Sequence, residues 1–271
     1  MLTLVTGTGY TGRRVLDRLP VDSAIGLSRS VIDTDRPLEL FDLDTTSVMP
    51  IKLPSHYSVI YTVPPKGRLQ RFLPMLAPSP LRFVYISTTG VYGDCRGNAV
   101  TESSPVNPSN ERAERRVAAE ALLTQWADQS GCQLIILRVP GIYGPGRLGI
   151  ERIKARMPVL SEADANPGNR IHVDDLASCC IAALSTNVPA GIYNVGDNDH
   201  RSSTAFTGEV ARQLGLPPPP QISRKAANDE FSPQRLSFMT ESRRVDTNKM
   251  REVLGVTPRY ANPEDGIRAS L

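Results

Sequence analysis

The sequence predicts an α/β fold in which helices cover both faces of a parallel β-sheet. Short, almost continuously apolar runs alternate with helix-like segments through the first half of the chain, which is typical of strands buried on both faces. The chain also begins with an apolar strand, a glycine-rich turn and a helix in direct succession. Its 271 residues are enough for one large domain, or for a domain with a smaller lobe.

The glycine turn, residues 6–12, joins a strand at residues 2–5 to a helix expected over 13–19. Gly7 lets the chain turn sharply, Gly9 lets the backbone approach a ligand, and Gly12 lets helix and strand pack closely. The free N–H groups and the positive dipole end of the helix then suit an anionic diphosphate. The turn therefore predicts nucleotide binding through residues Gly7, Thr8, Gly9, Tyr10, Thr11 and Gly12. The alternative is a structural turn, because glycine turns are common.

Five further strands are expected at residues 24–27, 38–41, 58–63, 81–86 and 134–139, with a helix over 111–126. In a parallel sheet the ligand lies beyond the carboxyl ends of the strands, so the site candidates are Gly7, Ser28, Thr62, Thr88 and Pro140. After about residue 150 the pattern loosens. There we expect a helix from 171–175 through 184, a strand at 191–195, a helix at 204–214, a stiff connector at 217–220 and a mobile loop at 226–240.

Composition excludes several classes of protein. The net charge is only +3 and no basic run is present, so nothing favours nucleic acid or a membrane surface as a partner. No apolar stretch approaches the roughly 20 residues of a spanning helix, and no cationic leader precedes the first strand. The cysteines fit neither a disulfide framework nor a zinc site, so we expect reduced, packing cysteines in a cytoplasmic protein without a metal: Cys95, Cys132, Cys179 and Cys180.

Five motifs occur in a fixed order: TGTGYTG at 6–12, STTGVYG at 87–93, RVPGIYGPG at 138–146, IHVDD at 171–175 and IYNV at 192–195. With them the chain resembles the extended short-chain dehydrogenase/reductases of the NAD-dependent epimerase/dehydratase type. The resemblance covers nearly the whole chain. It implies an NAD(P)-binding Rossmann domain over residues 1–150, and over 151–271 mainly a small substrate lobe interleaved with that domain.

The preferred cofactor follows from the end of the second strand. An NAD enzyme usually places an acid there for the ribose 2′-hydroxyl, whereas an arginine accommodates the 2′-phosphate of NADP. Here Ser28 and Arg29 follow the strand, and no acid occurs before Asp33. We therefore favour NADP over NAD; the alternative is that Arg29 is a solvated loop residue.

The resemblance also assigns other cofactor contacts. Asp42 and Leu43 resemble the pair that contacts the adenine, and Pro140, Gly141 and Ile142 resemble the segment that backs the nicotinamide. Thr62 and Val63, which end the fourth strand, complete the expected cofactor-binding set.

The catalytic positions depart from the family. The resemblance implies a Ser or Thr, a Tyr and a Lys four residues later, of which the Tyr exchanges a proton while hydride moves to or from the nicotinamide. Thr88 falls on the Ser/Thr position, but Arg112 and Arg116 replace the Tyr and Lys. An arginine does not lose its proton in proteins, so it cannot do the work of the tyrosine. The chain is similar to atypical members that lack this triad.

Two interpretations of Arg112 and Arg116 remain open. Family position favours a pair that clamps an anionic substrate group near the nicotinamide. The alternative is a solvated helix face, with Glu120 pairing Arg116 and Glu111 pairing Arg115.

Candidates for a replacement acid are Tyr92, Tyr143 and His172, of which Tyr92 and His172 are weak substrate-site candidates. For His172, beside Asp174 and Asp175, a capping and packing role is favoured over a catalytic one. Arg243 and Arg244 are expected either to reach a substrate phosphate or to lie on the surface.

Two functions fit this sequence. The first is an NADP-dependent oxidoreductase or epimerase-like enzyme that has replaced its proton donor and acts on a small, anionic substrate. The second is a catalytically silent cofactor-binding protein whose bound state alters a partner. An enzyme needs a proton source near the hydride, while a sensor needs only the pocket.

Overall fold

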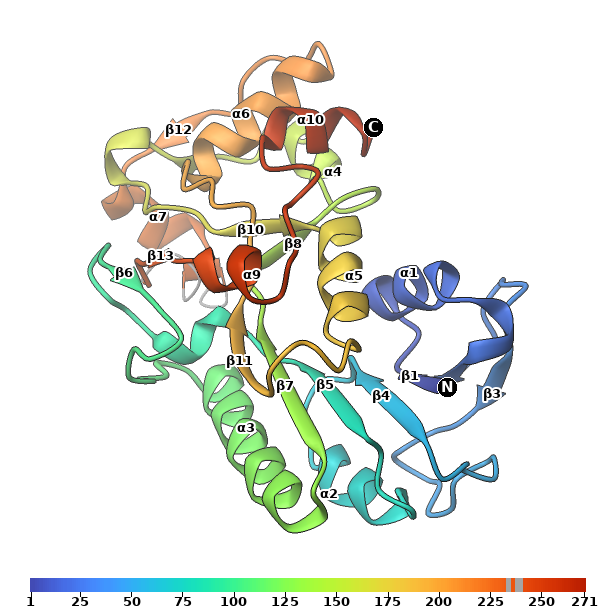
Figure 1. Ribbon diagram of the computed structural model, residues 1–271. Helices are drawn as coiled ribbons and strands as arrows, with labels where there is room; N and C mark the ends of the chain where they lie inside the picture. Colours follow the sequence, from blue (N-terminus) through green and yellow to red (C-terminus); the bar gives the residue numbers. More distant parts are fainter. Residues whose placement is uncertain (233–234, 237–240) are drawn as a thin grey trace.

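The computed structural model describes residues 1–232, 235–236 and 241–271, which form a central sheet with helices on both faces and a second group of elements above it (Figure 1). The seven strands of this sheet are parallel, in the order β11-β7-β5-β4-β1-β2-β3. Their bounds are β1 (Leu2–Thr6), β2 (Ala24–Ser28), β3 (Leu38–Leu40), β4 (Tyr57–Tyr61), β5 (Arg82–Ile86), β7 (Gln133–Arg138) and β11 (Gly191–Asn194). The sheet confirms the predicted α/β class, and the six strands expected before residue 150 are present.

The strand order creates the site. From β1 the chain adds β2 and β3 on one side, then crosses back to β4 and continues through β5, β7 and β11 on the other. Such a switch point leaves a crevice at the carboxyl ends of the two central strands. Gly7 follows β1 and Thr62 follows β4, and the Thr62 backbone N–H donates to the Thr6 carbonyl (2.9 Å). The residues of the glycine turn therefore stand at the switch point.

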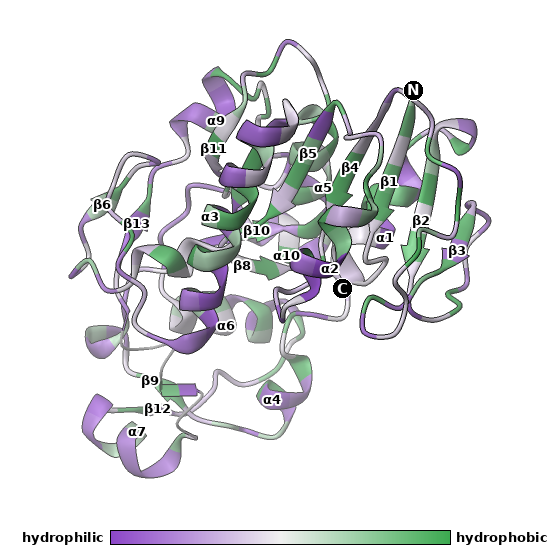
Figure 2. Ribbon diagram, turned by 90° about the horizontal axis from the view of Figure 1, so that it is seen from below, coloured by the Kyte–Doolittle hydropathy of each residue, from purple (hydrophilic) through white to green (hydrophobic). Residues whose placement is uncertain are grey.

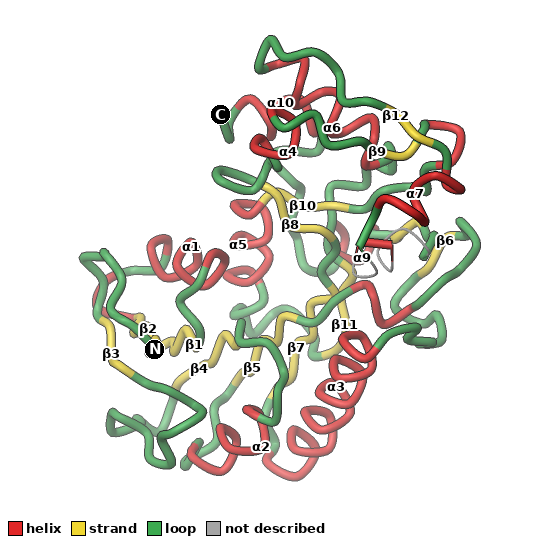
Figure 3. Tube along the Cα trace, turned by 180° about the vertical axis from the view of Figure 1, so that it is seen from behind, coloured by secondary structure: helices red, strands yellow, loops and turns green. Residues whose placement is uncertain are grey.

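Both faces of the sheet are buried under helices, as Figure 3 shows. Leu4 belongs to the cluster on one face, with Phe72 and Leu123, whereas its neighbour Val5 belongs to the cluster on the other face, with Leu176. Because neither face meets water, the strands are continuously apolar rather than alternating. The covering helices are α1 (Tyr10–Arg18) and α5 (Val173–Ala182) on one side and α2 (Arg68–Phe72) and α3 (Glu111–Ser130) on the other.

The cysteines behave as packing residues. All four are free thiols; Cys132, Cys179 and Cys180 are buried, and Cys95 is half-buried. Burial raises the pKa of Cys132 and of Cys180 to about 12, which keeps both thiols protonated and unreactive near neutral pH.

The remaining elements pack at the carboxyl ends of the sheet (Figure 1). Three two-stranded sheets pair β10 with β8, β12 with β9 and β13 with β6. The elements are β6 (Ala99–Val100), β8 (Gly141–Tyr143), β9 (Val159–Leu160), β10 (Arg170–His172), β12 (Gln221–Ile222), β13 (Arg244–Val245), α4 (Ile150–Lys154), α6 (Ser203–Gln213), α7 (Arg224–Glu230), α9 (Asn248–Glu252) and α10 (Pro263–Arg268). Figure 2 shows that α7 is largely hydrophilic, whereas β1, β4 and β5 are mainly hydrophobic.

One sequence expectation is wrong in this part of the chain. Residues 226–240 lack a clear period and were expected to form a loop, yet Arg224–Glu230 is the helix α7. Ser223 caps this helix by accepting from the Ala226 N–H, and Ala227 is buried with Leu160. The helix is too short to show a hydrophobic period, so its tertiary packing is what stabilises it. Residues 233–234 and 237–240 of the expected loop lie outside the described residues.

The outer edge of β11 is capped by two charged side chains. The Lys249 ammonium donates to the Ile192 carbonyl (2.7 Å), and the Glu102 carboxylate accepts from the Asn194 N–H (2.8 Å). An open strand edge is a template for pairing with another chain, and inward-pointing charges prevent that pairing. This edge is therefore closed to strand addition.

Asp197, three residues beyond β11, is a buried carboxylate with an incomplete set of partners. It is 4% exposed; Oδ1 accepts from the Asp199 N–H (3.0 Å), whereas Oδ2 has no partner among the described residues. Arg170, Asp199 and Tyr143 are the ionisable groups that interact with it. Burial raises the pKa of Asp197 to about 7.

We expect Asp197 to make the protein less stable as the pH rises. Its folded pKa lies above the ordinary aspartate value of 3.8, so the folded state holds the proton more tightly than the unfolded state. The stabilisation is complete below pH about 4 and is lost as the pH rises through about 7. Asp197→Asn, which stays neutral, should therefore raise Tm relative to the wild type at pH 8 and much less at pH 5.

Thermal unfolding followed by circular dichroism at pH 5, 6.5 and 8 checks this. Asp128→Asn, at an exposed position on α3, is the matched control and should leave the pH profile of Tm unchanged. A Tm difference for Asp197→Asn that is the same at all three pH values would contradict the expectation.

Candidate cofactor and substrate site

The three glycines of the turn have different surroundings. A Cβ at Gly7, whose φ is +90°, would lie 2.7 Å from Val63 Cγ2 and 2.8 Å from Thr62 Oγ1. A Cβ at Gly12 would lie only 2.0 Å from the Gly7 carbonyl oxygen, so α1 can pack here only without a side chain. A Cβ at Gly9, by contrast, would meet no atom within 4 Å. Gly7 and Gly12 thus serve the fold, and Gly9 borders open space.

The N-terminus of α1 is not neutralised by the protein. Gly9 is its N-cap and supplies no side-chain hydrogen bond, and the first turn holds no acidic residue. The free N–H groups of a first turn carry a partial positive charge that an anion can satisfy. Thr8 is 5% exposed, and its hydroxyl has no hydrogen-bond partner among the described residues.

A cavity of about 860 Å³ lies over this turn. Thr8, Gly9 and Tyr10 line it together with arginines of α1 and residues that begin α5. Its lining residues further along the chain are Arg13, Arg14, Asp17, Arg18, Ile32, Asp174, Asp175, Ser178 and Arg259. The cavity is large enough for a nucleotide.

The residues expected around the adenosine ribose are only partly available. The Ser28 hydroxyl donates to the Ser30 carbonyl (2.6 Å) and so closes a local turn. Arg29 is exposed, and the Arg13 guanidinium donates to the carbonyl of Asp33 in the same loop. Arg29 and Arg13 are therefore the cations beside this loop, while the Ser28 hydroxyl already has a partner.

The other expected cofactor residues lie near the ends of β3, β4 and β7. Leu43 is buried, and the half-buried Asp42 accepts from the Asp44 N–H (2.9 Å). The Thr62 hydroxyl donates to the Gly7 carbonyl (2.5 Å), which ties the end of β4 to the glycine turn. Pro140 precedes β8, in which Gly141 is exposed.

The three family catalytic positions are occupied as follows. Thr88 is half-buried at the end of β5, and its hydroxyl accepts from the Gly90 N–H (3.1 Å). Arg112 is exposed in the first turn of α3. Arg116, one turn later, donates through Nη1 to the Ile86 carbonyl (2.6 Å) and to the Tyr85 hydroxyl (3.2 Å). Arg116 thus fastens α3 to the carboxyl end of β5.

Glu120 does not pair with Arg116, which corrects one of the two sequence interpretations. It instead forms a buried ion pair with Arg138 (2.8 Å), in which the side chains are 8% and 5% exposed, respectively. The Ser87 hydroxyl donates to the same carboxylate (2.5 Å). Spacing along a helix cannot tell which face meets the sheet, and Glu120 lies on the buried face. The expected pair of Glu111 with Arg115 is present (3.2 Å).

The candidate replacement acids are all buried. The Tyr92 hydroxyl donates to Asn194 Oδ1 (2.7 Å), and burial raises the pKa of this phenol. Burial likewise raises the pKa of Tyr143, whose ring packs edge-on against His172. His172 Nδ1 accepts from the Asp174 N–H (3.2 Å) and so caps α5, while Nε2 lies 3.1 Å from Ser270 Oγ. The structure therefore gives His172 the favoured capping and packing contacts.

A second cavity, of about 400 Å³, is lined by residues at the carboxyl end of the sheet and by residues of the elements above it. Thr89, Gly141 and Ile142 line it, and the last two belong to the expected nicotinamide segment. Arg243 and Glu241 also line it, together with Tyr143, Leu160, Asn166, Pro167, Gly168, Asn169, Arg170, Ser203, Phe206 and Thr207. Residues distant in sequence thus meet beside the expected nicotinamide position.

Arg243 and Glu241 form the charged wall of this cavity. Arg243 Nη1 donates to Glu241 Oε2 (2.6 Å) and to the Gly93 carbonyl (2.5 Å). Glu241 Oε1 accepts from Asn110 Nδ2 (3.0 Å), so this wall is tied to the N-cap of α3. Arg244, in contrast, is exposed and donates to the carbonyl of Gly97. Sequence reasoning missed Glu241, because no spacing pattern links it to residues more than a hundred positions away.

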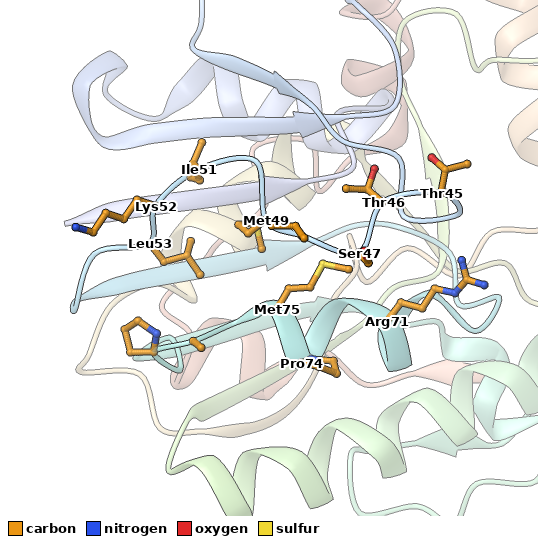
Figure 4. A pocket seen from close by; sticks show the side chains of 13 residues that line it. Thr45, Thr46, Ser47, Met49, Ile51, Lys52, Leu53, Arg71, Pro74 and Met75 are labelled. Atoms are coloured by element: carbon orange, nitrogen blue, oxygen red, sulfur yellow. The ribbon is translucent and has the colours of Figure 1, made fainter.

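A third cavity, of about 770 Å³, is formed by residues 45–53 and 71–78 and contains none of the predicted site residues (Figure 4). Figure 4 shows Met49 and Met75 in its middle, with Lys52 and Arg71 toward its ends.

Among the described residues no cluster of His, Cys, Asp and Glu side chains could hold a metal ion. No described helix is long and apolar enough to cross a membrane.

The chain is similar to known proteins over most of its length. The family model for the NAD dependent epimerase/dehydratase family matches residues 70–196. The human dTDP-D-glucose 4,6-dehydratase is 26% identical over 141 residues, which cover 49% of this chain and 40% of that protein. The chain thus spans less than half the length of this relative.

Two solved structures superimpose on nearly the whole chain. A functionally unknown conserved protein from Silicibacter pomeroyi is 29% identical, with a TM-score of 0.81 over 99% of this chain and 98% of that one. MoeE5, solved in complex with UDP-glucose and NAD, is 19% identical, with a TM-score of 0.78 over 100% and 97%. Residues 70–196 thus match the NAD dependent epimerase/dehydratase family, and the whole chain shares the fold of these two structures.

Proposed function

We propose that this protein is an NAD(P)-dependent oxidoreductase or epimerase-like enzyme that acts on a small anionic substrate. The observation that carries the proposal is the cavity of about 400 Å³, which is lined by Gly141, Ile142 and Arg243. A substrate there would lie beside the nicotinamide and beside a guanidinium. In this proposal residues 1–150 bind the cofactor and residues 151–271 mainly form the substrate lobe.

The glycine turn fits the diphosphate of a nicotinamide cofactor. Open space at Gly9, an acid-free helix N-terminus and the unpartnered Thr8 hydroxyl all favour an anion at this position. The cofactor would accept or supply a hydride. The protein would orient the cofactor through residues 7–12, through Thr62 and Val63, and through the segment 140–142.

Arg29 supports NADP as the preferred cofactor. It is exposed at the end of β2, and no carboxylate occurs between it and Asp33. The Ser28 hydroxyl is engaged with Ser30, so Arg29 rather than Ser28 would provide the contact to a 2′-phosphate. A guanidinium binds a phosphate through charge-assisted hydrogen bonds.

The anion contact is better supplied by Arg243 than by the α3 pair. Arg243 lines the cavity, whereas Nη1 of Arg116 already donates hydrogen bonds to the Ile86 carbonyl and the Tyr85 hydroxyl. The Glu241 carboxylate holds one edge of the Arg243 guanidinium, which leaves its remaining N–H groups for a carboxylate or a phosphate. Arg112 and Arg116 would then serve to position Thr88 and the end of β5.

A second candidate function is a catalytically silent, NADP-binding sensor. The burial of Tyr92, Tyr143 and His172 favours it, because these three replacement acids have hydrogen-bonding or packing roles inside the protein. A general acid contributes about 10²–10⁴-fold to a rate, so its absence is enough to suppress turnover.

We expect Gly9→Val to abolish cofactor binding while the protein stays folded. The new side chain would point into open space at an extended φ of −72°, so only a ligand would meet it. Cofactor fluorescence titration and circular dichroism test this. Gly12→Val is the matched contrast, because a Cβ there overlaps the Gly7 carbonyl and should unfold the turn. A folded Gly9→Val protein with unchanged affinity would refute the proposed cofactor site.

We expect NADPH to bind more tightly than NADH. Arg29→Asp should narrow or invert this preference by about 1–3 kcal/mol, which is typical of a lost charge-assisted contact. Titration of the wild type and the variant with both cofactors decides the matter. Equal affinities that the substitution leaves unchanged would remove the case for NADP.

Turnover on ordinary nucleotide sugars should be very low, because the family Tyr and Lys are absent. A screen with NADPH should instead find activity on small carbonyl compounds that carry a carboxylate or a phosphate. Arg243→Met should raise KM for them at least about tenfold, while Arg244→Met, outside the cavity, should not. Arg112→Tyr combined with Arg116→Lys should not raise this activity. Robust epimerisation of a nucleotide sugar, indifferent to Arg243, would contradict the proposal.

A further inference from the structure

The turn that joins β8 to α4 lies against the glycine turn. The Tyr10 hydroxyl donates to the Pro145 carbonyl (3.0 Å), and a Cβ at Gly144 would lie 2.6 Å from that hydroxyl and 2.8 Å from Val173. The Arg147 N–H donates to the Gly144 carbonyl (2.9 Å), which closes this second turn. Residues 144–147 are thus packed onto the start of α1.

The Arg147 side chain lies over the Tyr10 ring, and no carboxylate of the described residues neutralises its charge. Its guanidinium carbon lies 3.8 Å from the centre of the Tyr10 ring, and the residue is exposed. No carboxylate of the described residues lies within ion-pair distance of it. The neighbouring Arg14 differs, because it is paired with Asp174 (2.8 Å). A guanidinium stacked on an aromatic ring keeps its N–H edges free for an anion.

The surroundings of Arg147 favour a negative ligand. The first turn of α1 contains no acid, and its dipole and the Arg147 charge both favour an anion. Asp174, which also lines the cavity, is paired with Arg14. The Thr8 hydroxyl, buried and without a partner among the described residues, lines the same cavity as Gly9 and Tyr10. Burial raises the pKa of Tyr10, and Arg14 and Arg147 oppose this shift by favouring the anionic phenolate.

We propose that Arg147 binds the diphosphate of the cofactor from the side opposite the N-terminus of α1, an inference that rests on the proposed cofactor site. Two cationic groups, the helix end and the guanidinium, would then enclose the two phosphates. Tyr10 holds Arg147 in place by stacking and through its hydrogen bond to Pro145.

This arrangement connects the cofactor to the substrate cavity. Leu148 and Ile153, which follow Arg147, are buried in one cluster with Tyr143, and Tyr143 lines the cavity of about 400 Å³. An anion bound by Arg147 would therefore contact the segment that packs against Tyr143.

The test compares Arg147→Met with the wild type by titration with NADPH, NADH and ADP, which share the diphosphate, and with adenosine, which lacks it. The affinity for the three diphosphates should fall by a common factor of about 10–100, as expected when one charge-assisted hydrogen bond is lost. Adenosine binding should not change. Arg147→Lys should restore part of the affinity, and the difference between the proteins should shrink at high salt.

Arg152→Met, an exposed arginine on α4, is the matched control and should bind like the wild type. Thermal unfolding of each variant separates a loss of affinity from a loss of fold. If Arg147→Met binds ADP and NADPH like the wild type, whatever its Tm, the residue only supports Tyr10 and the inference is overturned. A wild type that binds neither ADP nor NADPH would overturn the proposed cofactor site together with it.

Discussion

The structure depends on the close approach of Gly12 to the carbonyl of Gly7, where a Cβ would lie 2.0 Å from that oxygen. This contact sets α1 directly against the central strands and buries Val15 and Leu16. It also directs the helix N-terminus to the carboxyl edge of the sheet, at the point where the strand order reverses. Thr62 completes the arrangement by donating its hydroxyl to the same Gly7 carbonyl. The core and the cavity over the turn are two consequences of one packing constraint.

The helix α3 is fastened to the sheet by charged side chains on its inner face. Glu120 and Arg138 form a buried ion pair that Ser87 also joins, just before Thr88. Loss of either charge would leave the other buried and uncompensated, which is costly in a low-dielectric interior. Arg116 fastens the next turn of α3 to β5. The end of β5 is therefore fixed against α3 by Glu120 and Arg116.

The upper group of elements is held to the sheet by polar contacts in addition to apolar packing, in which Ile171 of β10 and Met250 of α9 belong to the same cluster as Val5. Glu241 links the N-cap of α3 to Arg243, and Arg243 in turn donates to the Gly93 carbonyl. On the other side, the turn at residues 144–147 lies on Tyr10. Because both links border the two cavities, ligands there would contact the same residues that join the two parts of the chain.

The fold class and the glycine turn are determined by the sequence itself, since local patterns are enough to specify them. Apolar runs buried on both faces define the strands, and the spacing of Gly7, Gly9 and Gly12 defines the turn. The two arginines four residues apart, Arg112 and Arg116, are likewise visible in the sequence. These features depend on neighbours along the chain.

Only the tertiary structure decided which side chains meet. Glu120 pairs with Arg138 rather than Arg116, because its helix face turns toward the sheet. The Ser28 hydroxyl is taken up by Ser30, and the helix α7 forms where a loop was expected. Glu241 and Arg147 reach the candidate site from segments more than a hundred residues away from their partners. Such contacts depend on the path of the whole chain, and no local pattern of residues encodes them.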